Sequence, residues 1–169
     1  HYVFQSKAIY DRLPDEYTIP AALASYLRTF ISDRSRYDKF VFDGDSTAMT
    51  ADEIKGMKLF FSEKSQCSTC HNGALLTDHS FQNNGLKASY KNLDRGRQRV
   101  TYLPEDEGKF RVATLRNIAL TAPYMHDGSL ATLDDVLTHY QTHGSAHPTK
   151  STTIDKISLT DVEKKYIIQ

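Results

Sequence analysis

The stretch "QCSTCHNG", residues 66–73, holds the only two cysteines of the chain, two residues apart and followed at once by a histidine. A disulfide between residues so close would close a small, strained loop, and a thiol redox pair does not need the histidine. A zinc site usually takes two such cysteine pairs, and this chain has one. On one helical turn, Cys67 and Cys70 can present both sulfurs to one porphyrin edge. The motif therefore predicts covalent haem attachment with His71 as proximal iron ligand, and a redox or partial metal motif is the alternative.

Composition and charge limit the classes of protein to which this chain can belong. The 169 residues are 39% hydrophobic and suit one domain, or one domain with a small extension. Lys plus Arg and Asp plus Glu are 21 each, so no net basic field indicates nucleic acid or an anionic membrane. No apolar run approaches the roughly 20 residues of a membrane span. Haem is attached to this motif outside the bacterial cytoplasm, so we expect a periplasmic protein that is part of a longer precursor.

Helical periodicity and capping signals predict the secondary structure. Helices are expected over 19–32, 50–63, 132–143 and 159–169, with capping boxes at Thr50 and Thr160 and a third start at Thr132. Residues 33–47 read as a polar loop. Residues 72–114 carry turn signals without clear periodicity, and a large cofactor that replaces part of the core would explain so long a loop. The expected fold class is mainly α, with long loops that wrap a haem.

Four segments together resemble the bacterial diheme cytochrome c peroxidases and their relatives. They are "KGMKLFFSEKSQCSTCHNG", "FQNNGL", "GKFRVATLRNIALTAPYMHDGSLATLDDVLTHY" and "LTDVEKK". The resemblance covers nearly all of the chain and is to the C-terminal haem domain, which has a c-type cytochrome fold. The first haem domain and the tryptophan that lies between the haems in many members are absent. We therefore expect residues 50–169 to form the haem domain and residues 1–49 to form an extension that leads from, or packs against, the first domain.

The resemblance also implies an activity and partners. In the family, the C-terminal haem receives electrons from a small donor, such as a cytochrome c or a cupredoxin. It passes them to the other haem, which reduces hydrogen peroxide to water. One covalent haem c is expected here and a second in the missing domain, and a homodimer is compatible with the resemblance. Two alternatives stay open: a diheme enzyme that oxidises a protein substrate through high-valent iron, and a monohaem electron carrier.

Several further residues are assigned through the resemblance. Arg116, in "LRN", is expected to contact the haem or its propionates, since a guanidinium suits carboxylates. Thr121 and Pro123 match positions whose main-chain carbonyls bind calcium between the domains, although two carbonyls do not fill its coordination sphere.

The distal ligand of the iron is where this chain departs from the peroxidase pattern. Peroxidase relatives commonly carry a methionine fourteen residues after the histidine of "PYMHDG", and here that position is Tyr140. A tyrosine ligates the second haem in the quinone-maturing relatives, so Tyr140 is the expected distal ligand. His139, His143 and Met125 are the alternatives.

Overall fold

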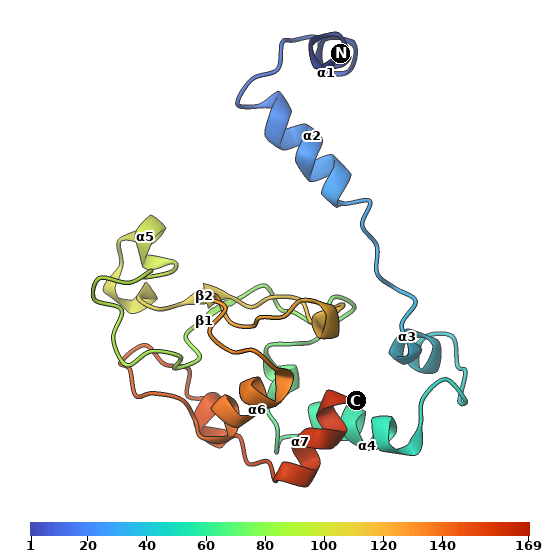
Figure 1. Ribbon diagram of the computed structural model, residues 1–169. Coiled ribbons are helices and arrows are strands. Elements are labelled where there is room, and N and C mark those ends of the chain that lie inside the picture. Colours follow the sequence, from blue (N-terminus) through green and yellow to red (C-terminus); the bar gives the residue numbers. More distant parts are fainter.

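The computed structural model describes residues 1–169 and is mainly helical, which confirms the expected fold class (Figure 1). Short 3-10 turns and irregular loops join the regular elements. The helices are α1 Tyr2–Tyr10, α2 Thr18–Leu27, α3 Arg36–Val41, α4 Ala51–Phe60, α5 Gln98–Thr101, α6 Leu133–Gln141 and α7 Asp161–Ile168, and the strands are β1 Phe81–Gln82 and β2 Phe110–Arg111.

Three of the predicted helices begin where their capping signals lie. Thr50, Thr132 and Thr160 are the N-caps of α4, α6 and α7, and each hydroxyl accepts a hydrogen bond from the backbone N–H three residues on. In each case the acidic side chain at that third position accepts from the N–H of the threonine. The capping box satisfies backbone donors that would otherwise lack partners, so the sequence places these starts well.

The prediction of a polar loop over residues 33–47 was wrong in part, because α3 lies within it. Ser35 caps this helix, and Asp38 completes a capping box with it. The helix has only six residues, too few for a hydrophobic period to stand out. The Ser-x-x-Asp spacing was the available signal. Helices α1 and α5 were likewise not predicted.

Helix α7 packs across α4 and brings the C-terminal end beside the segment that leads into the cysteine motif (Figure 1). The close approach occurs at Gly56, where a Cβ atom would collide with the carbonyl oxygen of Tyr166. Helix α6 also contacts α7, and Lys164 Nζ donates to Thr138 Oγ1 across 2.9 Å. These three helices form the frame from which the long loops emerge.

The long segment 72–114 is mostly irregular, as expected, but contains one short ladder. Strand β1 pairs antiparallel with β2, with Phe81 opposite Arg111 and Gln82 opposite Phe110. Two-residue strands give too short an alternation to be recognised in a sequence. The ladder ties the two ends of the segment together next to the cysteine motif, since Thr77 Oγ1 also donates to the Val112 carbonyl at 2.7 Å.

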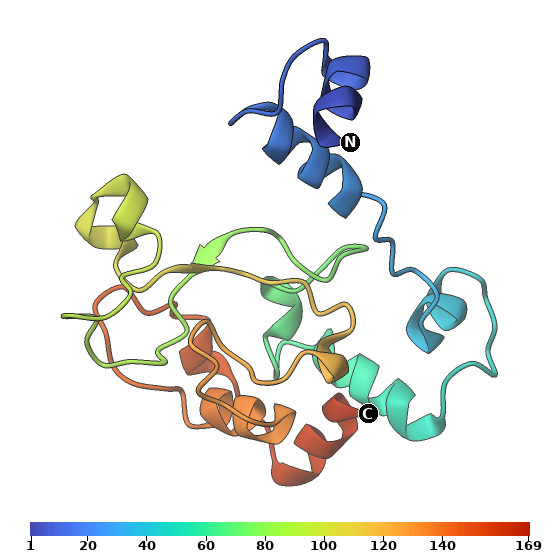
Figure 2. The same cartoon turned by 45° about the horizontal axis from the view of Figure 1, so that its top comes forward.

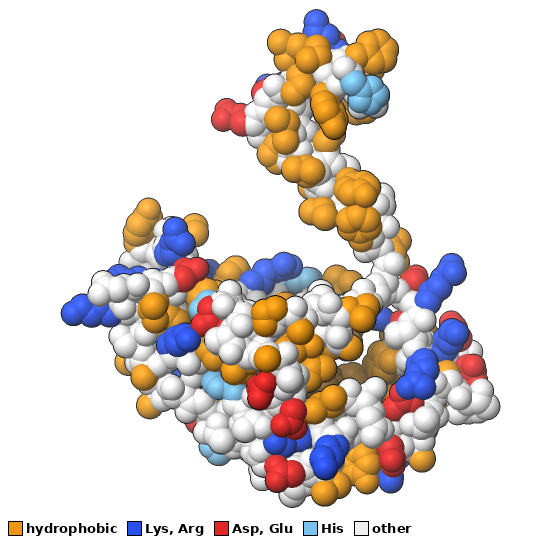
Figure 3. Space-filling model, viewed as in Figure 1, with side chains coloured by type: hydrophobic (Ala, Val, Ile, Leu, Met, Phe, Trp, Pro, Cys, Tyr) orange, Lys and Arg blue, Asp and Glu red, His pale blue; other side chains and the backbone are white.

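Helices α1 and α2 project away from the rest of the chain in both views (Figures 1 and 2). Helix α2 begins one residue before the predicted helix and ends at Leu27. The apolar side chains of both helices gather on the surface of this projection (Figure 3). The largest exposed ones include Tyr2, Phe4, Tyr17, Leu23, Tyr26 and Leu27.

Few apolar residues are buried for a chain of this composition. The buried ones are Tyr90, Tyr124, Ile157 and Leu159, and of these only Tyr90 is fully buried. A domain of this size normally buries a much larger apolar core. None of the helices has the length and apolarity required to cross a bilayer.

Candidate haem site

Cys67, Cys70 and His71 lie on one tight turn directly after α4. A 3-10 helix covers Cys67–Thr69, and the N–H groups of Cys70 and His71 both donate to the Cys67 carbonyl, at 3.3 and 2.9 Å. Both thiols are free and half-buried. The predicted helical turn is therefore present, and it keeps both sulfurs close to the histidine.

The two thiols do not have the environment of a redox pair. Burial raises the pKa of Cys67, and burial together with the nearby Asp78 carboxylate raises the pKa of Cys70. Reactive cysteines instead lie in electropositive surroundings that lower the pKa of the thiol. This difference favours covalent attachment over the redox alternative.

One nitrogen of the His71 ring is held by the backbone. Nδ1 lies 3.1 Å from the Leu76 carbonyl oxygen, an acceptor, so Nδ1 carries the proton and Nε2 keeps a lone pair. Burial lowers the pKa of His71, which also keeps the ring neutral. A neutral imidazole fixed through its second nitrogen is the usual arrangement of a histidine ligand to a metal.

Tyr140 comes from the last turn of α6 and lies close to the cysteine turn. Burial raises the pKa of Tyr140, and the Cys67 and Cys70 thiols add to the rise, whereas a hydrogen bond from the Asn84 side chain lowers it. The effect of both thiols on the phenol places Tyr140 in the surroundings of the cysteine turn, although the two segments are about 70 residues apart in the sequence.

The two alternative histidine ligands have their Nε2 atoms bound elsewhere. His139 Nε2 lies 2.9 Å from the Asn84 carbonyl oxygen, and His143 Nε2 lies 2.9 Å from the Ile157 carbonyl oxygen. Each bond holds its ring against the backbone of a neighbouring loop. Each bond leaves Nδ1 as the ring nitrogen with a lone pair, so both histidines stay alternatives to Tyr140.

Met125, the third alternative, lies in the same region and has a partner of its own. Its Sδ atom accepts a hydrogen bond from Asn84 Nδ2 at 3.1 Å. Asn84 therefore holds the sulfur of one candidate for the distal position. The sequence segment "FQNNGL" contains Asn84, but nothing in the sequence indicated this contact.

These residues fit a c-type haem. Two free thiols and an oriented imidazole supply what covalent attachment and proximal ligation require. Tyr140 is partly buried and carries an oxygen that can bind iron. The small apolar core described above is also what a domain built around a large apolar cofactor would have.

Arg116 makes a buried ion pair that the sequence did not predict. Its Nη1 lies 2.5 Å from Asp38 Oδ2, and its Nε donates to the Ala74 carbonyl at 2.9 Å. The side chains of Arg116 and Asp38 are 11% and 5% exposed. Because Arg116 binds both Asp38 and the Ala74 carbonyl, it links α3 to the loop that follows the cysteine motif. Helix α3 therefore contacts the predicted haem domain, residues 50–169, although it precedes residue 50. The expected contact of Arg116 with haem remains a prediction.

This ion pair should make stability depend on pH. The hydrogen bond from Arg116 lowers the pKa of Asp38 from 3.8 to about 2, so its stabilisation is complete above pH 3.8 and is lost as the pH falls toward 2. We expect Arg116→Ala to lower the free energy of unfolding by about 3 kcal/mol at pH 7, because it removes the cationic partner of a buried carboxylate. Urea unfolding should show this difference shrinking between pH 4 and 2. Arg99→Ala, at a residue 70% exposed, is the control, and an equal loss at both pH values would contradict the assignment.

Thr121 and Pro123 are exposed, and neither carbonyl oxygen accepts a hydrogen bond within the chain. No group of three or more His, Cys, Asp or Glu side chains is arranged to hold a metal ion. The chain thus offers two oxygens for a calcium ion and not a complete site.

Comparison with known proteins gives clear relatives, although no family model matches the chain. It is 36% identical to the cytochrome-c peroxidase IdrP1 of Denitromonas iodatirespirans, over 88% of this chain and 47% of the relative. It is 33% identical to the methylamine utilization protein MauG of Methylorubrum extorquens, over 89% of this chain and 42% of that protein.

A solved structure agrees with these relatives. A MauG-like protein associated with microbial copper homeostasis superposes with a TM-score of 0.82 at 36% identity, over 95% of this chain and 54% of that chain. The chain spans about half the length of the curated relatives that it matches. The chain is a homologue of the diheme cytochrome c peroxidases and MauG proteins and matches about half of their length.

Proposed function

We propose that this chain is the C-terminal, electron-relay haem domain of a diheme peroxidase that reduces hydrogen peroxide to water. The observation that supports this most is the oriented imidazole of His71 on the Cys67–Cys70 turn, together with Tyr140, whose pKa both thiols influence. A site with an imidazole on one face and a phenol near the other can hold iron on both faces. Iron so held suits electron transfer, because no position is left for peroxide.

Each residue of the haem site has a separate role in this proposal. Cys67 and Cys70 form thioethers with one haem, and His71 presents Nε2 because its Nδ1 is bound to the Leu76 carbonyl. The haem, when bound, supplies reversible one-electron chemistry at iron. Tyr140 closes the distal side. A small redox protein, a cytochrome c or a cupredoxin, delivers electrons in the periplasm.

The N-terminal part of the chain supports a two-domain protein. We assign residues 1–49 as the segment that packs against or leads from a first haem domain, which carries the second haem, and residues 50–169 as the haem domain. The exposed apolar residues of α1 and α2 suit such a contact (Figure 3). The free carbonyls of Thr121 and Pro123 would supply part of a calcium site completed by the other domain or by water.

A second candidate function is oxidation of a protein substrate. The observation that favours it is Tyr140 itself, which replaces the methionine expected in a peroxidase. An anionic oxygen ligand stabilises ferric iron, whereas a thioether ligand raises the potential. The 33% identity to MauG is compatible with this reading. A monohaem carrier is the third candidate.

Peroxide turnover with a reduced cytochrome or dye as donor tests the main proposal. We expect the full-length parent protein to turn over peroxide and the 169-residue chain, loaded with haem, to have little activity. Trials with candidate protein substrates separate the two enzyme functions. A parent without peroxide turnover would contradict the peroxidase, and an isolated chain as active as its parent would contradict the relay role.

A further inference from the structure

The Asn84 side chain is held at both ends of its carboxamide. Oδ1 accepts a hydrogen bond from the backbone N–H of Leu86 at 3.2 Å, and Nδ2 donates to Met125 Sδ at 3.1 Å. Because a backbone N–H can only donate, Oδ1 must face Leu86 and the NH₂ group must face Met125. The orientation of the amide is therefore set by its neighbours.

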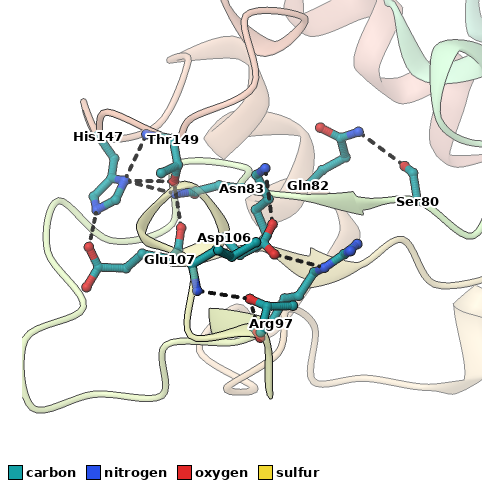
Figure 4. Close-up of polar contacts among 11 residues, drawn as sticks. Ser80, Gln82, Asn83, Arg97, Asp106, Glu107, His147 and Thr149 are labelled. Carbon is teal, nitrogen blue, oxygen red and sulfur yellow. Dashed lines mark hydrogen bonds and ion pairs between the residues drawn. The ribbon is translucent and has the colours of Figure 1, made fainter. Parts of the chain in front are cut away.

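The backbone that carries Asn84 is fixed as well. Next to it, the fully buried Asn83 bonds through Nδ2 to Thr149 Oγ1 at 2.9 Å and through Oδ1 to the N–H of Gly85 at 2.9 Å (Figure 4). The Gly85 carbonyl accepts from the N–H of Ser145 at 2.7 Å. This network leaves Asn84 little freedom to move when a neighbouring side chain moves.

The residue that Asn84 holds is intrinsically mobile and a competent iron ligand. Methionine is unbranched and has three rotatable side-chain bonds, so its sulfur can reach several positions from one backbone site. Thioether sulfur is also a common axial ligand of c-type haem. Met125 is bound to the Asn84 side chain, and Tyr140 lies against the ring of His139, whose Nε2 is 2.9 Å from the Asn84 carbonyl oxygen. Met125 and Tyr140 therefore lie around one residue, as competition for one distal position requires.

We propose that Asn84 is a positioning residue that selects the distal ligand, because it binds the Met125 thioether and so leaves the iron to Tyr140. This inference rests on the proposed haem site. According to this inference, the Asn84 carboxamide determines whether the iron has a phenolate ligand and a low reduction potential, or a thioether ligand and a higher one. One net hydrogen bond corresponds to roughly a tenfold change in a population ratio, which sets the scale of the effect.

The test is ligand spectroscopy of haem-loaded Asn84 variants of the chain. Asn84→Leu, and Asn84→Asp as a variant of equal size that lacks the donor, should raise the Met-ligated fraction about tenfold. The readouts are the long-wavelength absorption band of methionine-ligated ferric haem, the electron paramagnetic resonance spectrum and an upward shift in midpoint potential. The double variant Asn84→Leu with Met125→Leu should lose the new signals. Gln82→Leu, in β1 two residues before Asn84, should behave as wild type.

The outcomes separate this inference from the proposed function. If the wild type shows His/Tyr ligation and both Asn84 variants keep its spectrum and potential, the inference is wrong and the haem site stands. The inference is also wrong if the new signals persist in the double variant, since Met125 would then not be their source. A wild type that is already Met-ligated contradicts both the inference and the assignment of Tyr140.

Discussion

Replacing both Cys67 and Cys70 with Ala is expected to abolish retention of haem through acid extraction and to remove the cooperative unfolding transition of the chain. The four buried apolar residues cannot supply the core of a domain this size, so the cofactor has to supply the rest. Native domains are stable by only about 5–15 kcal/mol, so losing a core element of this size should unfold the chain. Thermal melting followed by far-ultraviolet circular dichroism measures this effect.

Single variants test each of the two thioether bonds separately. Cys67→Ala or Cys70→Ala should each leave one thioether, and the pyridine haemochrome spectrum should shift to the position of a singly attached haem. Thr69→Ala, an exposed site on the same turn, is the matched control and should behave as wild type. A double variant that melts as cooperatively as wild type would show that the fold does not depend on the attached cofactor.

Replacing Tyr140 with Phe is expected to open the distal face of the iron. The phenyl ring keeps the packing but has no oxygen to donate, so the low-spin His/phenolate signal should vanish from the electron paramagnetic resonance spectrum. Cyanide, excluded from iron held on both faces, should bind at least about tenfold more tightly, a change of about 1.4 kcal/mol. The midpoint potential should rise, because an anionic oxygen donor stabilises ferric iron.

Matched variants separate ligation from packing at this position. Tyr102→Phe, at a tyrosine 83% exposed, should change none of these signals. An unchanged spectrum in Tyr140→Phe would show that Tyr140 packs beside the haem without binding it. If the signal is lost only on replacing His139 or His143, the distal assignment moves to that residue.

Local signals in the sequence predicted the helical frame well. The capping boxes of α4, α6 and α7 are satisfied by neighbours three residues away, so they can be read without knowledge of the fold. The cysteine motif also depends only on neighbouring residues, and the helical turn predicted for it is found in the structure. Helix α3 was missed because six residues show no period, and β1 and β2 because their pairing joins residues about 30 apart.

The contacts that complete the site depend on the tertiary fold. Asp38 and Arg116 are 78 residues apart, and no periodicity or spacing relates them. The contact between Asn84 and Met125 likewise joins two loops. Tyr140 was predicted from a resemblance between families, and its approach to the cysteine turn became visible only in three dimensions.

The central claim is that this chain carries one haem held by two thioethers, and the mass of the denatured, purified chain tests it most directly. The chain should be expressed together with a cytochrome c maturation system, then denatured, extracted with acidic acetone and weighed by mass spectrometry. We predict the polypeptide mass plus one haem, with a pyridine haemochrome spectrum of the two-thioether kind. A mass equal to the bare polypeptide, with the haem in the acetone phase, would contradict the account.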